Sequence, residues 1–358
     1  MTKIEFDHIA YLDIPGGGQV TVKDGLCFVG HIDPPHGTTI VDVADPCAPR
    51  VIARLEAPAD TRTHKVRVSN GTMLINNEAL SSKQPAEFFP GLRIFDITRP
   101  SNPREIGCFR TGGRGMHRFD FDGRYAYLST EMEGYRGNIV LIIDLHDPSR
   151  PQEVSRWWLP GQWVAGGEDP TLHKGHRVHH PLRFGNRLYV SCCNAGMALV
   201  DVSDLCHPRT IVRHPLHGLF THTVMPYQDS AGDDFVVAVD EGWWKLEGGV
   251  TVLSLDQSLA ASIVAAHNMA PGEGKRIWAA HQPFERMIGD RLFVAWFGHG
   301  LRVLDMSKPA VPIEVGNFLP KERGEFGVMS NDVFVDPAQR RAYLLDRARG
   351  LDILEFRT

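Results

Sequence analysis

The chain has 358 residues, of which 42% are hydrophobic and 23% charged, with a formal net charge of −5 and a pI of about 6.4. This composition is that of a globular protein, and it gives no support to a nucleic-acid or membrane-surface partner. No apolar run is long enough to span a bilayer, and the N-terminal segment lacks a signal-peptide core. The six cysteines include no Cys-x-x-Cys pair. We therefore expect a cytoplasmic protein with free thiols.

The first predicted element is an outer strand at the N-terminus. The segment HIAYLDIP, from His8, resembles the segment VIARLEAP, from Val51, which follows the first copy of a repeat described below. The last copy of that repeat ends with ILEFRT and has no such outer strand of its own. We therefore expect residues 8–15 to pair with the strand that ends near Phe356, which would leave no unpaired edge.

One sequence motif recurs along the chain. It consists of an apolar run followed by an aspartate, an apolar residue and a proline-rich turn. Proline cannot donate to a strand ladder, so the turn ends each strand. Two alternating strands precede each copy and a short one follows, which makes four strands per unit, as in a propeller blade. The clear copies are TTIVDVADPCAP from Thr38, LRIFDITRPSNP from Leu92, VLIIDLHDPSRP from Val140, MALVDVSDLCHP from Met197 and LRVLDMSKPAVP from Leu301, with degenerate copies from Val250 and Leu351.

The seven copies predict a single all-β domain over residues 1–358, a seven-bladed β-propeller closed by the N-terminal strand. The clear copies resemble the LVIVD-repeat family of β-propellers over almost the whole chain. This resemblance implies the fold but no particular activity, because the repeats are structural. The aspartates of the repeat recur in every clear copy, which favours a structural role in the turn over metal ligation: Asp42, Asp96, Asp144, Asp201 and Asp305.

Histidine occupies one equivalent position, the start of the first strand, in five consecutive blades, where the first and last blades have Gly18 and Asn331. The first strand of a propeller blade is innermost, so we expect these histidines to converge on the axis. Imidazole nitrogen is a good ligand for Fe, Cu, Zn or Mn. The alternative is that histidine is only a consensus residue of the repeat. We predict that at least three of the five ligate one metal ion: His64, His117, His180, His222 and His281.

Carboxylates stand near the end of the second strand in three blades. Since the first two strands run antiparallel, these carboxylates should lie beside the histidines. A carboxylate in that place accepts the outer ring N–H of a ligand histidine and fixes its tautomer. We expect this role for Glu78, Glu131 and Glu241, and we count Glu131 and Glu241 also as candidate catalytic groups. The alternative for each is a solvated strand end.

Loops on the same face carry aromatic and basic side chains that suit a small organic substrate, anionic or aromatic. The loop before the fourth innermost strand adds His173 and His176 as candidate acid–base groups. Ordinary loop packing is the alternative. The candidate substrate-binding residues are Phe88, Tyr135, Arg136, Trp243, Trp244 and Lys245.

An axial metal held by histidines, with carboxylates behind them, is similar in plan to the carotenoid cleavage oxygenases and, in outline, to the selenium-binding and methanethiol oxidase propellers. The resemblance is one of site design, without an extended sequence match. It implies Fe(II), with Mn, Cu or Zn as alternatives, and oxygenation or oxidative cleavage of a small organic substrate. A Lewis-acid hydrolase, lyase or isomerase and a non-catalytic interaction propeller stay open as alternatives, and the oligomeric state is open as well.

Overall fold

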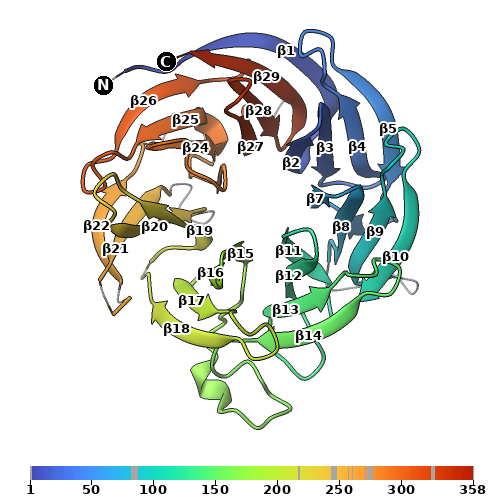
Figure 1. Ribbon diagram of the computed structural model, residues 1–358, viewed down its shortest axis with the longest axis vertical. Coiled ribbons are helices and arrows are strands. Elements are labelled where there is room, and N and C mark those ends of the chain that lie inside the picture. The colour runs from blue at the N-terminus through green and yellow to red at the C-terminus, as the bar shows by residue number, and fades with distance from the viewer. Residues whose placement is uncertain are drawn as a thin grey trace. The chain divides into compact units, whose positions relative to one another are not determined.

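The computed structural model describes residues 2–81, 88–216, 218–242, 248–256, 258–259, 261–270, 272, 277–323 and 327–357. These residues form seven antiparallel sheets, six with four strands and one with five (Figure 1). Each sheet is a blade, and the prediction of an all-β, seven-bladed β-propeller is confirmed. No helix among the described residues is long and apolar enough to cross a membrane.

The blades follow one another along the chain, and only the seventh takes its outer strand from the N-terminus. Among the described residues, the 3-10 helices η1 (Pro170–Leu172) and η3 (Phe297–His299) lie between strands. The strands are β2 (Gly17–Lys23), β3 (Leu26–His31), β4 (His36–Asp42) and β5 (Arg50–Glu56) in the first blade; β6 (Thr61–Arg62), β7 (Val66–Ser69), β8 (Thr72–Ala79), β9 (Gly91–Asp96) and β10 (Arg104–Arg110) in the second; β11 (Met116–Phe121), β12 (Tyr125–Thr130), β13 (Ile139–Asp144) and β14 (Gln152–Trp157) in the third; β15 (His180–Phe184), β16 (Arg187–Ser191), β17 (Met197–Asp201) and β18 (Arg209–His214) in the fourth; β19 (Thr221–Gln228), β20 (Asp234–Asp240), β21 (Val250–Leu255) and β22 (Ala261–His267) in the fifth; β23 (Gln282–Pro283), β24 (Arg291–Trp296), β25 (Gly300–Asp305) and β26 (Ile313–Phe318) in the sixth; and β27 (Ser330–Asp336), β28 (Arg341–Asp346), β29 (Arg349–Arg357) and β1 (Glu5–Pro15) in the seventh.

The chain forms two compact units. Unit 1 comprises Met1–Cys27, Asp42–Arg50 and His222–Thr358, and unit 2 comprises Phe28–Val41 and Val51–Thr221. The single domain over residues 1–358 stays a prediction.

The aspartates of the repeat have the structural role that their recurrence suggested. Each carboxylate accepts the backbone N–H of the residue two positions later, as in the bonds from Ala44 to Asp42 at 3.1 Å and from His146 to Asp144 at 2.8 Å. The same bond occurs at Asp96, Asp201 and Asp305. These aspartate turns end the third strand of each blade and start the connection to the fourth.

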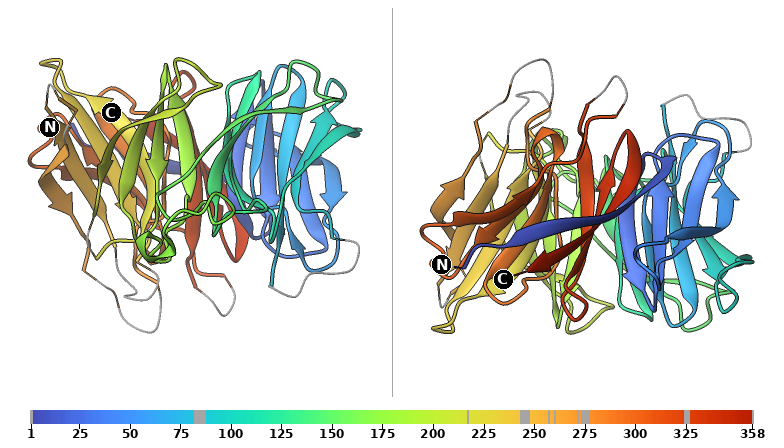
Figure 2. Two further views of the ribbon diagram at one scale, coloured as in Figure 1. Left: turned by 90° about the horizontal axis from the view of Figure 1, so that it is seen from below. Right: turned by 90° about the horizontal axis from the view of Figure 1, so that it is seen from above.

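The outer edge of the seventh blade is covered by the N-terminal strand. Strand β1 pairs antiparallel with β29, from Glu5 opposite Arg357 to Pro15 opposite Arg349 (Figure 2). The ring of Phe6 packs edge-on against Phe356, with ring centroids 6.3 Å apart. The predicted closure is confirmed, and it removes an exposed strand edge.

The core of each unit consists of the apolar faces of neighbouring blades. In unit 2, Tyr127 and Val140 of the third blade pack with Leu188 and Val190 of the fourth. In unit 1, Phe293 and Val303 of the sixth blade pack in one cluster with Leu344, Leu354 and Phe356 of the seventh. The middle strands of these blades, such as β12 and β13, are buried along nearly their whole length, because each sheet is covered on both faces.

The packing of β1 on β29 predicts that Phe356, whose side chain is 4% exposed, contributes to stability. Replacement of Phe356 by alanine should lower the free energy of unfolding by about 3–5 kcal/mol, because it leaves a cavity beneath β1. Denaturant unfolding checks this, with the exposed Arg357→Ala as the control, for which a change below about 0.5 kcal/mol is expected. Equal losses in the two variants would contradict the packing of β1 on β29.

Candidate metal centre

The five histidines of the predicted register lie at the start of the first strand of their blades. His117 and His222 are the second residues of β11 and β19, and His180 begins β15. His64 and His281 lie just before β7 and β23. Except for His117, which is partly buried, all are 5% exposed or less. These positions bring several of the histidines into contact within each unit.

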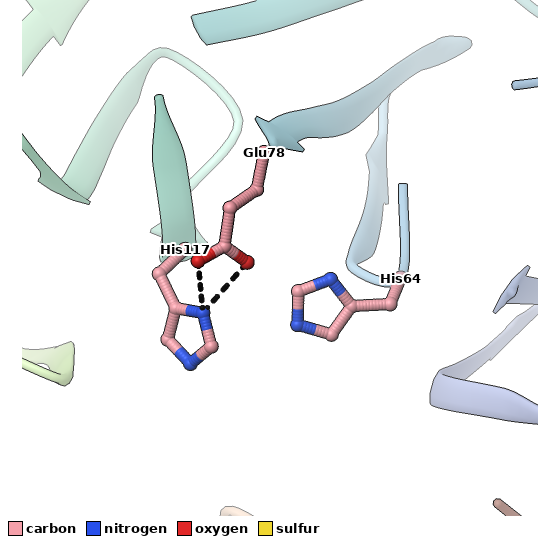
Figure 3. A group of neighbouring side chains, drawn as sticks. All are labelled: His64, Glu78 and His117. Atoms are coloured by element: carbon pink, nitrogen blue, oxygen red, sulfur yellow. Dashed lines mark hydrogen bonds and ion pairs between the residues drawn. The ribbon is translucent and has the colours of Figure 1, made fainter. Parts of the chain in front are cut away.

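In unit 2, the carboxylate of Glu78 contacts Nδ1 of His117, which we call the outer nitrogen of the ring. The two carboxylate oxygens are 3.0 and 2.9 Å from His117 Nδ1, and His64 lies beside the pair (Figure 3). A carboxylate accepts hydrogen bonds, so Nδ1 carries the hydrogen and Nε2 keeps its lone pair. Burial lowers the pKa of His117 well below its ordinary value, which keeps the ring neutral. A neutral ring held at Nδ1 by a carboxylate is the form in which histidine binds a metal.

The lone pair of His117 Nε2 points at a second histidine. His179 Nε2 lies 3.1 Å from His117 Nε2. Two nitrogens bound at right angles to one ion at about 2.1 Å would lie about 3.0 Å apart. The ring of His64 is 5.3 Å from that of His117, and ligand atoms of His64, Glu78 and His117 lie within 4.8 Å of one another. We call His64, Glu78, His117 and His179 the His117 cluster; the spacing of its His117 and His179 Nε2 atoms fits two imidazole ligands of one divalent first-row metal.

Basic neighbours of Glu78 oppose the effect of burial on its charge. Arg62 Nη2 lies 3.2 Å from Glu78 Oε2, and both side chains are largely buried. Burial raises the pKa of Glu78, while the charges of Arg62, Arg177 and Arg114 act in the opposite direction. Arg62 therefore supports the anionic carboxylate that orients His117.

In the fourth blade, His180 begins the innermost strand as predicted, and a second histidine, His179, directly precedes it. His179, and not His180, lies beside His117, whereas Nδ1 of His180 is 3.4 Å from Nη1 of Arg118. Successive side chains of an extended chain point to opposite faces, so only one of two adjacent histidines can point toward His117. The repeat alignment selects His180, the first paired residue of β15. The side chain that points toward His117 is that of the preceding residue, His179.

This difference predicts unequal effects of two adjacent substitutions. His179→Ala should weaken metal binding by more than about tenfold, because it removes a donor that faces His117. His180→Ala should leave the metal affinity nearly unchanged, because the Nδ1 of His180 is already engaged by a guanidinium. Competitive metal titration of the two variants measures this. A larger loss of metal affinity in His180→Ala than in His179→Ala would instead support His180 as the ligand, as the sequence register predicts.

In unit 1, the outer nitrogens of His222 and His281 are both bonded to acceptors. The hydroxyl of Thr223 donates to Gln282 Oε1 at 3.1 Å, so its oxygen accepts from His222 Nδ1 at 2.9 Å. His281 Nδ1 donates to the carbonyl oxygen of Asn331. Both rings therefore carry their hydrogen on Nδ1 and keep a lone pair on Nε2.

The carboxylate of Glu241 lies on the lone-pair side of these two rings. Its oxygens are 3.9 Å from His222 Nε2 and 3.7 Å from His281 Nε2, which is too long for a hydrogen bond. The ring centroids of the two histidines are 4.2 Å apart. We call His222, Glu241 and His281 the His222 cluster. Three electron-rich groups that face one another at these distances are stabilised by a cation, and two histidines with one carboxylate suit non-haem Fe(II).

The three predicted carboxylates therefore have three different positions. Glu78 contacts the outer nitrogen of a histidine as expected, but that histidine is His117 in the next blade rather than His64. Glu241 lies on the inner side of its histidines. Glu131 accepts the backbone N–H of Arg114 at 2.9 Å instead of a ring N–H.

The candidate substrate and acid–base residues form two contacts in unit 2. Tyr135 packs on Trp158, with ring centroids 5.3 Å apart, and on Trp163, at 6.4 Å. His173 Nε2 donates to the carbonyl oxygen of His176 at 2.8 Å. Trp158, Trp163 and Arg62 occupy no distinctive position of the repeat, so the sequence does not predict their contacts. Phe88 is buried and Arg136 exposed, while Trp243, Trp244 and Lys245 lie outside the described residues.

Comparison with known proteins identifies the repeat and the fold. The LVIVD repeat model matches residues 184–213 and 287–319. No curated protein matches the sequence. A periplasmic gluconolactonase of Pseudomonas aeruginosa, PpgL, superposes with a TM-score of 0.64 at 14% identity, covering 89% of this chain and 88% of that one. The C-terminal WD40 domain of Sif2 gives 0.62 at 11% identity and 99% coverage of both chains.

Raptor of Chaetomium thermophilum gives a TM-score of 0.66 at 11% identity, over 98% of this chain and 29% of that one. These likenesses show a propeller fold shared by proteins of different functions. The chain is a seven-bladed β-propeller whose fourth and sixth blades contain segments that match the LVIVD repeat.

Proposed function

We propose that the protein is a metal-dependent enzyme that binds divalent metal through histidine nitrogen of the His117 cluster, of the His222 cluster, or of each separately. One observation carries this proposal: His117, His222 and His281 all have the outer nitrogen bonded to an acceptor, so each presents a lone pair at Nε2. Histidines that only pack in a core need no common tautomer, whereas ligand histidines do.

Fe(II) is the first choice of metal, with Mn, Cu or Zn as alternatives, because the His222 cluster combines two imidazoles with one carboxylate. Bound Fe(II) would supply activation of dioxygen, and we propose oxygenation or oxidative cleavage of a small organic substrate. Glu78, Thr223 and the carbonyl of Asn331 hold the histidine rings in the ligating tautomer.

A second candidate is Lewis-acid chemistry, as in a hydrolase, lyase or isomerase. The position of Glu241 favours it, because a carboxylate on the ligand side of the histidines can also accept a proton from a metal-bound water. The similar gluconolactonase propeller is a hydrolase by name, which agrees with this candidate but concerns the fold alone.

Anaerobic purification followed by metal analysis and oxygen-uptake assays on a panel of small organic compounds separates the candidates. The proposal expects a bound divalent ion and oxygen uptake that is lost on chelation. Bound Zn or Mn with turnover in the absence of oxygen would select the Lewis-acid candidate. A protein that takes up no ion would contradict both candidates and favour an interaction propeller.

A further inference from the structure

A small cavity lies in unit 1, beside the N-terminal strand of the seventh blade. Its walls come from β1, the end of β28, β29 and the segment between β26 and β27. Its volume is about 10 Å³, which is room for a single small polar group. The charged and aromatic residues of the lining are Tyr11, Lys321, Arg323, Asp346, Arg349 and Asp352.

The ring of Tyr11 holds two arginine side chains at this cavity. The guanidinium carbon of Arg323 lies 3.5 Å from the centroid of that ring, in a cation–π contact. Arg349 Nε donates to the Tyr11 hydroxyl oxygen at 3.3 Å. The ring lies directly against the backbone of Gly350, where φ is +78° and a Cβ would come within 2.2 Å of Tyr11 Cε2. The two guanidinium groups are therefore preorganised on one fixed ring.

The two carboxylates of the lining are bound to other groups. Asp346 accepts three backbone N–H groups, at 2.7, 2.8 and 3.2 Å. Asp352 Oδ1 lies 2.8 Å from His8 Nε2. Within the described part of the chain, Arg323 and Arg349 form no ion pair, and the Nη groups of Arg349 donate no hydrogen bond. Two arginines thus line one cavity without a carboxylate partner.

The charges of the lining indicate which ligand suits it. Three basic side chains, of which Lys321 is the third, and two carboxylates give a formal charge of +1, three minus two. A partly buried guanidinium favours an anion, and its planar fork suits a carboxylate by two parallel hydrogen bonds. By contrast, Arg357 at the other end of β29 is paired with Asp7 at 2.7 Å.

We propose that this cavity binds the carboxylate group of a small organic anion through Arg323 and Arg349. The group enters the cavity, and the remainder of the anion lies outside it. A monoanion matches the charge of the lining, whereas a phosphate dianion would be repelled more strongly by Asp346 and Asp352. The inference does not depend on the proposed function, because no residue of the lining belongs to a histidine cluster.

Proton NMR relaxation of the acetate methyl group, titrated against the full chain, tests the proposal. Phenanthroline, a neutral chelator, is present so that acetate does not bind to a metal ion. Neutral acetamide and inorganic phosphate are the comparison probes. Acetate should bind at least about tenfold more tightly than acetamide, because only the anion forms charged hydrogen bonds with the arginines.

Substitution of each arginine assigns the binding to this cavity. Arg323→Gln and Arg349→Gln should each weaken acetate binding more than about tenfold, with circular dichroism unchanged. Arg357→Gln, which changes an exposed residue of the same strand, is the matched control and should have no effect. Equal affinity for acetate and acetamide, or an unchanged acetate affinity in either arginine variant, would overturn the proposal. Tighter binding of phosphate than of acetate would overturn it as well.

Discussion

Replacement of His222 by alanine is expected to lower metal affinity by more than about 100-fold and to abolish activity while the blades stay folded. The loss should exceed the 10–100-fold that is typical of an outer hydrogen-bond partner, because a donor to the ion itself is removed. His222 is 1% exposed, and its Nε2 faces the carboxylate of Glu241 and the ring of His281. Metal titration, activity assays and circular dichroism measure the three effects.

The matched control for His222→Ala is His146→Ala, which removes an exposed histidine at the end of β13. It should change neither metal affinity nor activity. Full metal retention and activity in His222→Ala would count decisively against the His222 cluster as a metal site.

Replacement of Glu78 by glutamine should reduce metal affinity or activity about 10–100-fold. The amide keeps the size of the side chain but loses the charge, and it can present its NH₂ group to the N–H of His117. His117 would then lose the partner that fixes its ligating tautomer. Metal titration and activity assays check the expectation.

Two other carboxylates near this site serve as controls for Glu78→Gln. Glu131→Gln should have little effect, because its side chain accepts from the backbone of Arg114 and not from a ring. Glu133→Gln changes an exposed loop residue and should have none. If Glu78→Gln affects metal affinity no more than these two variants do, Glu78 does not act on the metal through His117.

The fold could be predicted from the sequence because its information is local and repeated. Each copy of the repeat contains its own strand end, where an aspartate accepts the N–H two residues later, as at Asp42 and Asp144. The closing strand was predictable for a different reason. HIAYLDIP has the composition of an outer strand without a blade of its own, and the last copy lacks one, so the pairing of β1 with β29 followed.

The histidine positions could be predicted as a register, but not the direction of each side chain. At His117 the ladder between β11 and β12 shifts, because Met116 is opposite Thr130 and Arg118 is opposite Ser129. Such a bulge turns a side chain away from the regular alternation, and a repeat alignment does not detect it. The choice between His179 and His180 likewise depends on where the ladder of β15 begins.

The partner of each carboxylate could not be read from the repeat, because it depends on contacts between blades. Glu78 belongs to the second blade, yet it forms a bridge with Gly115 and contacts His117 of the third. Asn331 stands where the seventh blade lacks a histidine, and its carbonyl accepts from His281 of the sixth. Its side chain donates to Gly18 O at 2.8 Å, so the two positions without histidine are bonded to each other.

The central claim is that imidazole nitrogen of these clusters binds a divalent metal. X-ray absorption spectroscopy at the metal edge of the loaded protein tests it most directly. The account predicts nitrogen or oxygen neighbours at about 2.0–2.2 Å, together with the outer-shell scattering of several imidazole rings, weaker in His222→Ala. A metal surrounded by oxygen alone, with no imidazole scattering in the parent protein, would contradict the account.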